Sequence, residues 1–343
     1  MKYQRIAAMV SPLVFLAAAW MVVPLDSPPG ATMTSAAKEF LASLKPEQTA
    51  QAAYPFESKH RTDWHFVPLQ DAQRKPTRAG IRLELLDTPQ KEKAMALLRA
   101  GTSAEGARAA ETIMSLESLL HEMEGTKGVN VRNPNWYFVS IYGEPGKGDW
   151  GWRFEGHHLS LNFTLTGEEV ISATPAVFAS NPAEVLNGSR KGTKPIFNVQ
   201  DIALELTGSL DAPQAAKARR EQPHPEVEAK TVAASPSELK GLTSGEMNDN
   251  QKAILNRLVQ AYLRRLAEPI AKREWNRIEQ TPGDLYFSYY RDENKPGKPM
   301  TYRVARKDFQ VEFLNVQADG EGNPANHIHS AFRTLPKDFG GKQ

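Results

Sequence analysis

The stretch from Trp150 to Phe163 constrains the fold of this chain most, because its alternating pattern changes parity in the middle. Its apolar residues are first even-numbered and then odd-numbered: Trp150, Trp152, Phe154, Leu159, Leu161 and Phe163. Side chains of a strand alternate between two faces, so an unbroken strand would turn the second half of this set away from the core. We therefore predict a β-bulge at Gly156-His157 that keeps all of them on one packing face. The opposite face then carries groups able to bind or catalyse: Arg153, Glu155, His158, Ser160 and Asn162.

The same period of two extends on both sides of this stretch. It predicts a β-meander of three strands at 136–142, 150–165 and 169–174, with a turn at 143–149. Three further strands are predicted near the C-terminus, at 285–290, 301–306 and 309–316. Helical spacing predicts helices at 35–44, 90–99, 104–124, 199–210 and 248–277. The pattern indicates an α+β fold, an antiparallel sheet built from the central meander and the C-terminal strands, with helices packed on one face.

Two boundaries and one loop follow from local signals. Ser103 is an expected N-cap of the helix at 104–124, and Gly125 is expected to end it. Residues 211–240 are rich in Pro, Ala and Glu, and we expect an exposed loop in the latter part. Residues 31–343 are otherwise expected to form a single domain.

The first 30 residues are expected to be a targeting segment. Lys2 and Arg5 precede an apolar run from Ile6 to Val23 of about 18 residues. This pattern is typical of a secretory signal peptide, and the run is also nearly long enough for a retained membrane anchor. Both alternatives place the folded part outside the cytoplasmic membrane, as a periplasmic, secreted or anchored protein. A buried N-terminal helix is the third interpretation.

Composition removes several classes of function. The net charge is only +2, and no run of Lys and Arg resembles a nucleic-acid footprint, so we expect no nucleic-acid partner. Membrane contact is expected only through the N-terminal segment. There is no cysteine, so thiolate nucleophiles and Cys-ligated metals are excluded. A metal must be held by His, carboxylate, amide or carbonyl groups.

Four of the eight histidines fall in two short motifs. His327 and His329 form an H-x-H pair, which in an extended segment places both imidazoles on one side. Such a pair with one distant ligand is a common way to hold Zn, Fe, Cu or Mn, and we predict His158 as the third ligand. Hydrogen-bonded structural roles or substrate-contacting roles are the alternative. His157 is expected to be a satisfied core or interface histidine.

The remaining candidates surround these histidines. Glu155 or Glu312 is the candidate base, and Arg153 is the candidate clamp on a substrate. Asn162, Asn326 and Arg333 are candidate ligand-binding residues, and Arg333 also has Asp338 within reach for an ion pair. Trp150, Trp152 and Phe154 are expected to be core residues rather than a platform for a sugar.

Several of these motifs resemble the DUF3500 family of uncharacterised proteins. They are Trp136-Tyr-Phe-Val-Ser-Ile-Tyr-Gly143, Trp150 to Asn162, Thr174-Pro with Asn181-Pro-Ala-Glu184, and Asn326-His-Ile-His-Ser330 with Arg333 and Asp338-Phe-Gly340. The similarity runs from about Ala36 to Gly340. It implies no activity, but it supports treating the two histidine motifs as parts of one module.

Three functions stay open from sequence. The first is an exported metal-dependent hydrolase or oxidoreductase acting on a small molecule. The second is a non-catalytic exported protein that binds a small ligand, and the third is a structural surface protein whose histidines are only hydrogen-bonded.

Overall fold

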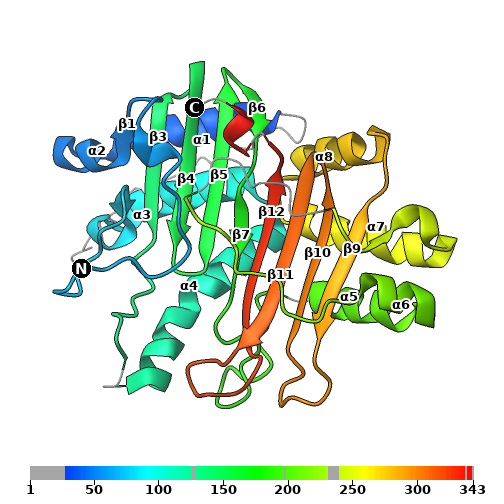
Figure 1. Ribbon diagram of the computed structural model, residues 1–343. Coiled ribbons are helices and arrows are strands. Elements are labelled where there is room, and N and C mark those ends of the chain that lie inside the picture. The colour runs from blue at the N-terminus through cyan, green and yellow to red at the C-terminus, as the bar shows by residue number, and fades with distance from the viewer. Residues whose placement is uncertain (1–27, 126–127, 197, 231–238, 337, 342–343) are drawn as a thin grey trace, which may run out of the picture.

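One large, mostly antiparallel sheet organises the chain (Figure 1). The computed structural model describes residues 28–125, 128–196, 198–230, 239–336 and 338–341. Within these residues the sheet has 12 strands, in the order β1-β3-β4-β5-β7-β12-β11-β10-β9-β8, with β2 beside β3 and β6 beside β5. The strands are β1 (Ala53–Tyr54), β2 (Ile81–Arg82), β3 (Phe138–Glu144), β4 (Lys147–Gly156), β5 (Leu159–Thr166), β6 (Glu169–Ser172), β7 (Ala176–Phe178), β8 (Leu242–Thr243), β9 (Tyr286–Arg291), β10 (Met300–Arg306), β11 (Phe309–Gln317) and β12 (His327–Thr334).

Helices cover one side of this sheet and bury its apolar face, as the α+β prediction requires. They are α1 (Pro29–Ser43), α2 (Pro46–Ala52), α3 (Thr88–Gly101), α4 (Ala104–Glu124), α5 (Val199–Gly208), α6 (Ala212–Ala218), α7 (Asp249–Leu263) and α8 (Glu268–Gln280). Short 3₁₀ turns are η1 (Lys59–Arg61), η2 (Leu83–Leu85), η4 (Ser244–Glu246) and η5 (Asp338–Gly341). Among the described residues no helix is long and apolar enough to cross a membrane, and the predicted targeting segment lies almost wholly outside them.

The other side of the sheet, which we call the loop-covered face, carries a smaller core. It is formed by Trp64, Phe66, Val177, Ala179, Val227, Leu314, Ala331 and Phe339. Val177, Leu314 and Ala331 lie in strands, and the residues next to them along each strand face the helices. The other five residues lie in connecting segments and in η5. The polar groups predicted as a functional face lie on this side, beneath connecting segments rather than in open solvent.

The stretch from Trp150 to Phe163 is a hairpin, so the predicted bulge is wrong. Strands β4 and β5 pair from Asp149↔Thr166 to Gly156↔Leu159, and His157 and His158 form the turn between them. Directly paired residues share a face, and here even-numbered residues of β4 pair with odd-numbered residues of β5. The packing face is nevertheless as predicted: Trp152 stacks on Phe163 with ring centroids 4.3 Å apart. The two-residue turn, rather than a bulge, keeps the apolar residues of both strands on one face.

The helix predicted over 248–277 is two helices, α7 and α8. Pro269 stands in the first turn of α8, two residues after the N-cap Ala267. Proline has no N–H to donate within a helix, and its ring clashes with the carbonyl four residues earlier, so the chain does not continue as one regular helix. Helix α4 agrees with its prediction at both ends: Ser103 Oγ accepts a hydrogen bond from Gly106 N, and Gly125 with φ of 52° ends it.

Residues 211–240 are not simply an exposed loop. They begin with α6 and continue across the loop-covered face, where His224 and Val227 are buried. Val227 joins the smaller core and so anchors this segment to the sheet. Most of the other described side chains here are exposed, as expected, and residues 231–238 lie outside the described part.

Strand β7 joins the meander to the C-terminal strands. Its three residues pair with the first residues of β5 on one side and with β12 on the other. Ser180, just beyond β7, bridges to Ile328 at the start of β12. Because adjacent strands keep this register, the β4–β5 turn and the beginning of β12 lie at the same end of the sheet. Two motifs far apart in the sequence are thereby brought together.

Candidate metal centre

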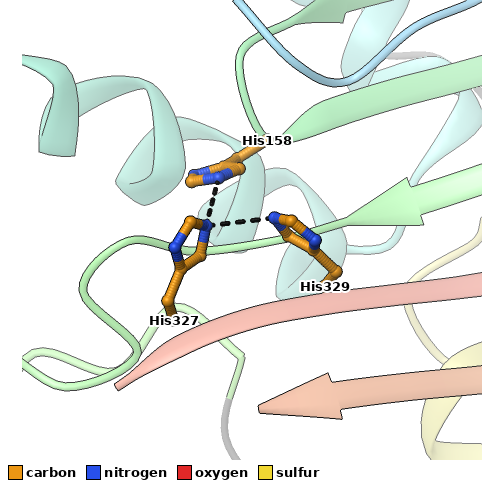
Figure 2. A group of neighbouring side chains, drawn as sticks. All are labelled: His158, His327 and His329. Atoms are coloured by element: carbon orange, nitrogen blue, oxygen red, sulfur yellow. Dashed lines mark hydrogen bonds between the residues drawn. The ribbon is translucent and has the colours of Figure 1, made fainter. Parts of the chain in front are cut away.

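Three histidines meet at this end of the sheet (Figure 2). His158 lies in the β4–β5 turn with a left-handed φ of 64°, and its backbone is held by hydrogen bonds to Phe66 and Ala179. His327 and His329 are alternate residues of β12 and point to the same side, as the H-x-H spacing predicts. His158 and His329 are buried, whereas His327 is partly exposed.

The imidazole nitrogens of the three rings converge. Nε2 of His327 lies 2.9 Å from Nε2 of His158 and 3.0 Å from Nε2 of His329. One ligand atom from each ring lies within 4.8 Å of the others. Two nitrogens bound to one ion at 2.0–2.1 Å must lie within about 4.2 Å of each other. The two closer pairs meet that limit, and the third pair lies within 4.8 Å. The group could therefore hold a metal ion.

Two outer contacts fix which nitrogens face inward. Nδ1 of His329 lies 2.8 Å from Oε1 of Glu226. The His327 ring makes a hydrogen bond to the backbone of Ala318, and Nδ1 is the nitrogen left for it because Nε2 faces the other histidines. Each of these Nδ1 atoms then carries the proton, and a neutral imidazole has only one. The Nε2 lone pairs of His327 and His329 consequently face each other at 3.0 Å, an arrangement that a cation between them stabilises.

The electrostatics keep the rings of His158 and His327 neutral. Burial, followed by the charges of His157, His327 and His329, lowers the pKa of His158 well below its usual value. Burial, followed by the neighbouring histidines, lowers the pKa of His327 to about 3. Neutral imidazole is the form that binds a metal, so these rings need not lose a proton at neutral pH to act as ligands.

His157 is a satisfied, mostly buried histidine, as predicted. Its Nδ1 lies 2.5 Å from Oε1 of Glu117 on α4, and Arg132 contacts the same nitrogen at 3.2 Å. Its ring stacks on His158 with centroids 3.7 Å apart. It therefore supports the ring of His158 by stacking.

Arg153 and Glu155 form a separate buried network. The Glu155 carboxylate forms ion pairs with Arg78 at 2.9 Å and with Arg153 at 3.3 Å. It also accepts hydrogen bonds from the His65 backbone N–H at 3.0 Å and from the Ser160 hydroxyl at 3.2 Å. Within the described residues no hydrogen bond or ion pair links Glu155 or Arg153 to the three histidines. The pair fastens the segment around His65 to the sheet.

The other predicted site residues are also held in their own contacts. Glu312 is buried and pairs with Arg303 at 2.9 Å, although burial raises its pKa. The Asn162 amide donates to Pro175 and Ser160. Asn326 bridges Glu184 and Asp319, and thus holds the 181–184 loop beside the start of β12. The structure places the three histidines together, and it places these residues around them rather than among them.

Arg333 forms the buried ion pair with Asp338 that the sequence suggested. Nη2 of Arg333 lies 2.5 Å from Oδ2 of Asp338, and its guanidinium lies 5.3 Å from the centroid of the Trp64 ring. Both residues are fully buried. The pair fixes η5 against the sheet.

Sequence analysis did not identify Glu226 and Ala318. Glu226 lies in a segment of ordinary charged and proline residues, and nothing in its local pattern distinguishes it from Glu221 or Glu228. Ala318 contributes only backbone. Both act through tertiary contacts, so no local signal was available.

Comparison with known families supports treating both histidine motifs as one module. The family model described as "Protein of unknown function (DUF3500)" matches residues 27–341, almost the whole chain. The chain belongs to the DUF3500 family. No curated protein and no solved structure matches it significantly. Membership in DUF3500 therefore defines the extent of the module, and function has to be argued from the site.

Proposed function

We propose that this DUF3500 protein is an exported, metal-dependent enzyme whose metal is bound by His158, His327 and His329. The observation that carries the proposal is the convergence of three Nε2 atoms with the outer nitrogens of His327 and His329 engaged by Ala318 and Glu226. An imidazole that donates its other N–H to a carboxylate or carbonyl is the usual outer arrangement of a metal-binding histidine.

Three imidazole ligands favour Zn, Fe, Cu or Mn over Mg or Ca, which prefer oxygen ligands. A three-histidine set also leaves coordination positions free, as in catalytic rather than structural sites. A metal held there would supply Lewis acidity toward a water or a substrate oxygen. A hydrolase or an oxidoreductase of a small molecule is the class of enzyme that we propose.

The residues around the histidines then have supporting roles. Glu226 and the Ala318 carbonyl orient two of the rings, and His157 supports the third by stacking. Partial exposure of His327 gives the side from which a ligand approaches. Glu155 and Arg153, which the sequence suggested as base and clamp, hold the covering segment in place.

Metal analysis of the purified protein tests this proposal. We expect about one Zn, Fe, Cu or Mn per chain by elemental analysis after reconstitution, and a lower melting temperature with chelator. The double variant His327→Ala/His329→Ala should contain no stoichiometric metal and should not respond to chelator.

His121→Ala is the matched control, because His121 is exposed on α4. It should bind metal like the wild type. A wild-type protein that takes up no metal and shows no response to chelator would instead support a hydrogen-bonded histidine cluster and overturn the metal proposal.

Export is the second part of the proposal and rests on Lys2, Arg5 and the apolar run from Ile6 to Val23. Fractionation of expressing bacteria with sequencing of the mature N-terminus tests it. A processed or membrane-attached product outside the cytoplasm supports export. An unprocessed protein in the cytoplasm contradicts it.

A further inference from the structure

A second polar site lies on the loop-covered face, where residues 220–225 cross β9 and β10. A cavity of about 180 Å³ is lined by Arg220, His224, Pro225, Lys240, Tyr286, Ser288, Arg303 and Ala305. It adjoins a larger groove of about 410 Å³ that shares Arg220, Lys240 and Ser288. Three of the residues that line the smaller cavity are cationic, and none of them is a carboxylate.

Two guanidinium nitrogens here are buried without a partner. Nε of Arg220 and Nε of Arg303 have no hydrogen-bond acceptor. Arg303 is held by Glu312, which accepts from Nη2 at 2.9 Å and leaves Nε unused. A buried cationic N–H without an acceptor is costly unless a ligand or water satisfies it. Both unused donors belong to residues that line the same cavity.

The hydrogen bonds of His224 can supply a third donor. Thr301 Oγ1 accepts from the His224 backbone N–H and contacts Nδ1 of the ring, both at 3.0 Å. Because a hydroxyl oxygen can accept two hydrogen bonds, two tautomers of the ring satisfy these contacts. In the tautomer with the proton on Nε2, the ring donates to Ser288 Oγ at 3.0 Å. The hydroxyl proton of Ser288, which lines the cavity, is then available to a ligand.

The pKa of His224 reflects the same positive charges. Burial, followed by the charges of Arg303 and Arg220, lowers this pKa to about 2. Both guanidinium groups are thus close enough to influence a buried neutral ring. An anion placed between them would meet favourable charges and hydrogen-bond donors from several directions.

We propose that this cavity is an oxyanion site, and that its ligand is a phosphate or phosphate monoester group. Donors from Arg220, Arg303 and Ser288 come from three separate segments, which suits a tetrahedral group with several acceptor oxygens. The lining carries the cationic side chains of Arg220, Lys240 and Arg303, of which Arg303 is also paired with Glu312, so the cavity attracts an anion.

The site is distinct from the histidine cluster and does not rest on the proposed metal. Thr301 on β10 pairs with Leu314 on β11, which pairs with His329 on β12. Thr301 in the second site and His329 in the histidine cluster therefore lie two strand spacings apart, about 10 Å. The same segment serves both, because His224 contacts Thr301 while Glu226 contacts His329.

Isothermal titration of the purified full chain with inorganic phosphate tests this proposal. The protein is first treated with chelator in a phosphate-free buffer, so that no metal captures the anion. We expect one phosphate per chain, competition by sulfate and much weaker binding of acetate. Arg220→Gln should weaken phosphate binding about tenfold or more.

Arg264→Gln is the matched control, because Arg264 is exposed at the end of α7, away from the cavity, and it should bind like the wild type. If Arg220→Gln does not fold, Lys240→Gln provides the same comparison at the shared wall of cavity and groove. Absence of saturable phosphate binding, or equal weakening by Arg264→Gln, would overturn the proposal. Loss of binding in His327→Ala/His329→Ala would also overturn it, since that result places the anion at the histidines.

Discussion

The carboxylate of Glu226 lies 2.8 Å from Nδ1 of His329. This contact joins the segment after α6 to the centre of the sheet, and it directs the other nitrogen of His329 toward His327. Burial raises the pKa of Glu226, but its contacts with His329 and with the Val227 backbone outweigh that effect and leave the pKa lowered. Glu226 is thus the carboxylate most directly coupled to the histidine cluster.

Glu226→Gln should therefore weaken metal binding about 10- to 100-fold while leaving the three ligands in place. The amide keeps the size of the side chain but removes the charge that raises the basicity of the imidazole. Competition with a chelator of known affinity measures the change. Glu221→Gln, an exposed change in the same segment, is the control, and an equal effect of both variants would contradict the role of Glu226.

His158→Ala should reduce metal binding more than His157→Ala. His158 presents its nitrogen to His327, whereas His157 only stacks on its neighbour and pairs with Glu117. Removing one of three ligands weakens the chelate directly, but removing the stacking ring only loosens one ligand. Elemental analysis after dialysis compares the metal content of the two variants. A larger loss of metal in His157→Ala than in His158→Ala would contradict the assignment of His158 as the ligand.

Gly106→Ala should destabilise the protein by about 2 kcal/mol or more, although alanine favours helices. A Cβ at this position in α4 would lie 1.9 Å from the Arg265 carbonyl oxygen, so the backbone after α7 would have to move. Gly208→Ala is the matched control, because its Cβ would meet nothing within 4 Å, and it should be neutral or slightly stabilising. Urea unfolding of both variants gives the comparison. Equal stabilities would show that α4 is not packed so closely.

Because its ring is buried and neutral, His224 should make the folded protein less stable in mild acid than at neutral pH. Its pKa is about 2 in the folded protein and 6.5 ordinarily, so between these values only the unfolded state takes up the proton. Stability is then lost as the pH falls below 6.5. From pH 7 to 5.5 this residue alone should cost about 1 kcal/mol.

The variant His224→Gln tests this contribution through the slope of stability against pH in phosphate-free buffer. Its free energy of unfolding should fall less steeply than that of the wild type over this interval. The other buried histidines remain in both proteins, so the difference isolates His224. Parallel curves for the two proteins would contradict the prediction.

Local sequence patterns predicted much of the architecture. The boundaries of α4 follow from Ser103 and Gly125, since capping depends on residues within one turn. The packing face of Trp152 and Phe163 follows from parity, because side chains of a strand alternate whatever the strand pairs with. The H-x-H spacing in the same way placed His327 and His329 on one side of β12.

Where the predictions failed, a choice between local alternatives depended on the rest of the fold. A bulge and a hairpin turn both restore the parity around His157, and only the pairing of β4 with β5 distinguishes them. Pro269 was a local signal for the break between α7 and α8, but the continuous apolar stripe favoured one helix.

The sequence by itself therefore determined the faces of the strands, several helix ends and the pair His327 and His329. Tertiary structure alone decided that β7 would bring His158 to that pair, and that Glu226 would reach His329. The physical reason is that periodicity and capping act over a few residues. Strand order and the path of a covering segment depend instead on which distant surfaces are buried together, and no local pattern records that.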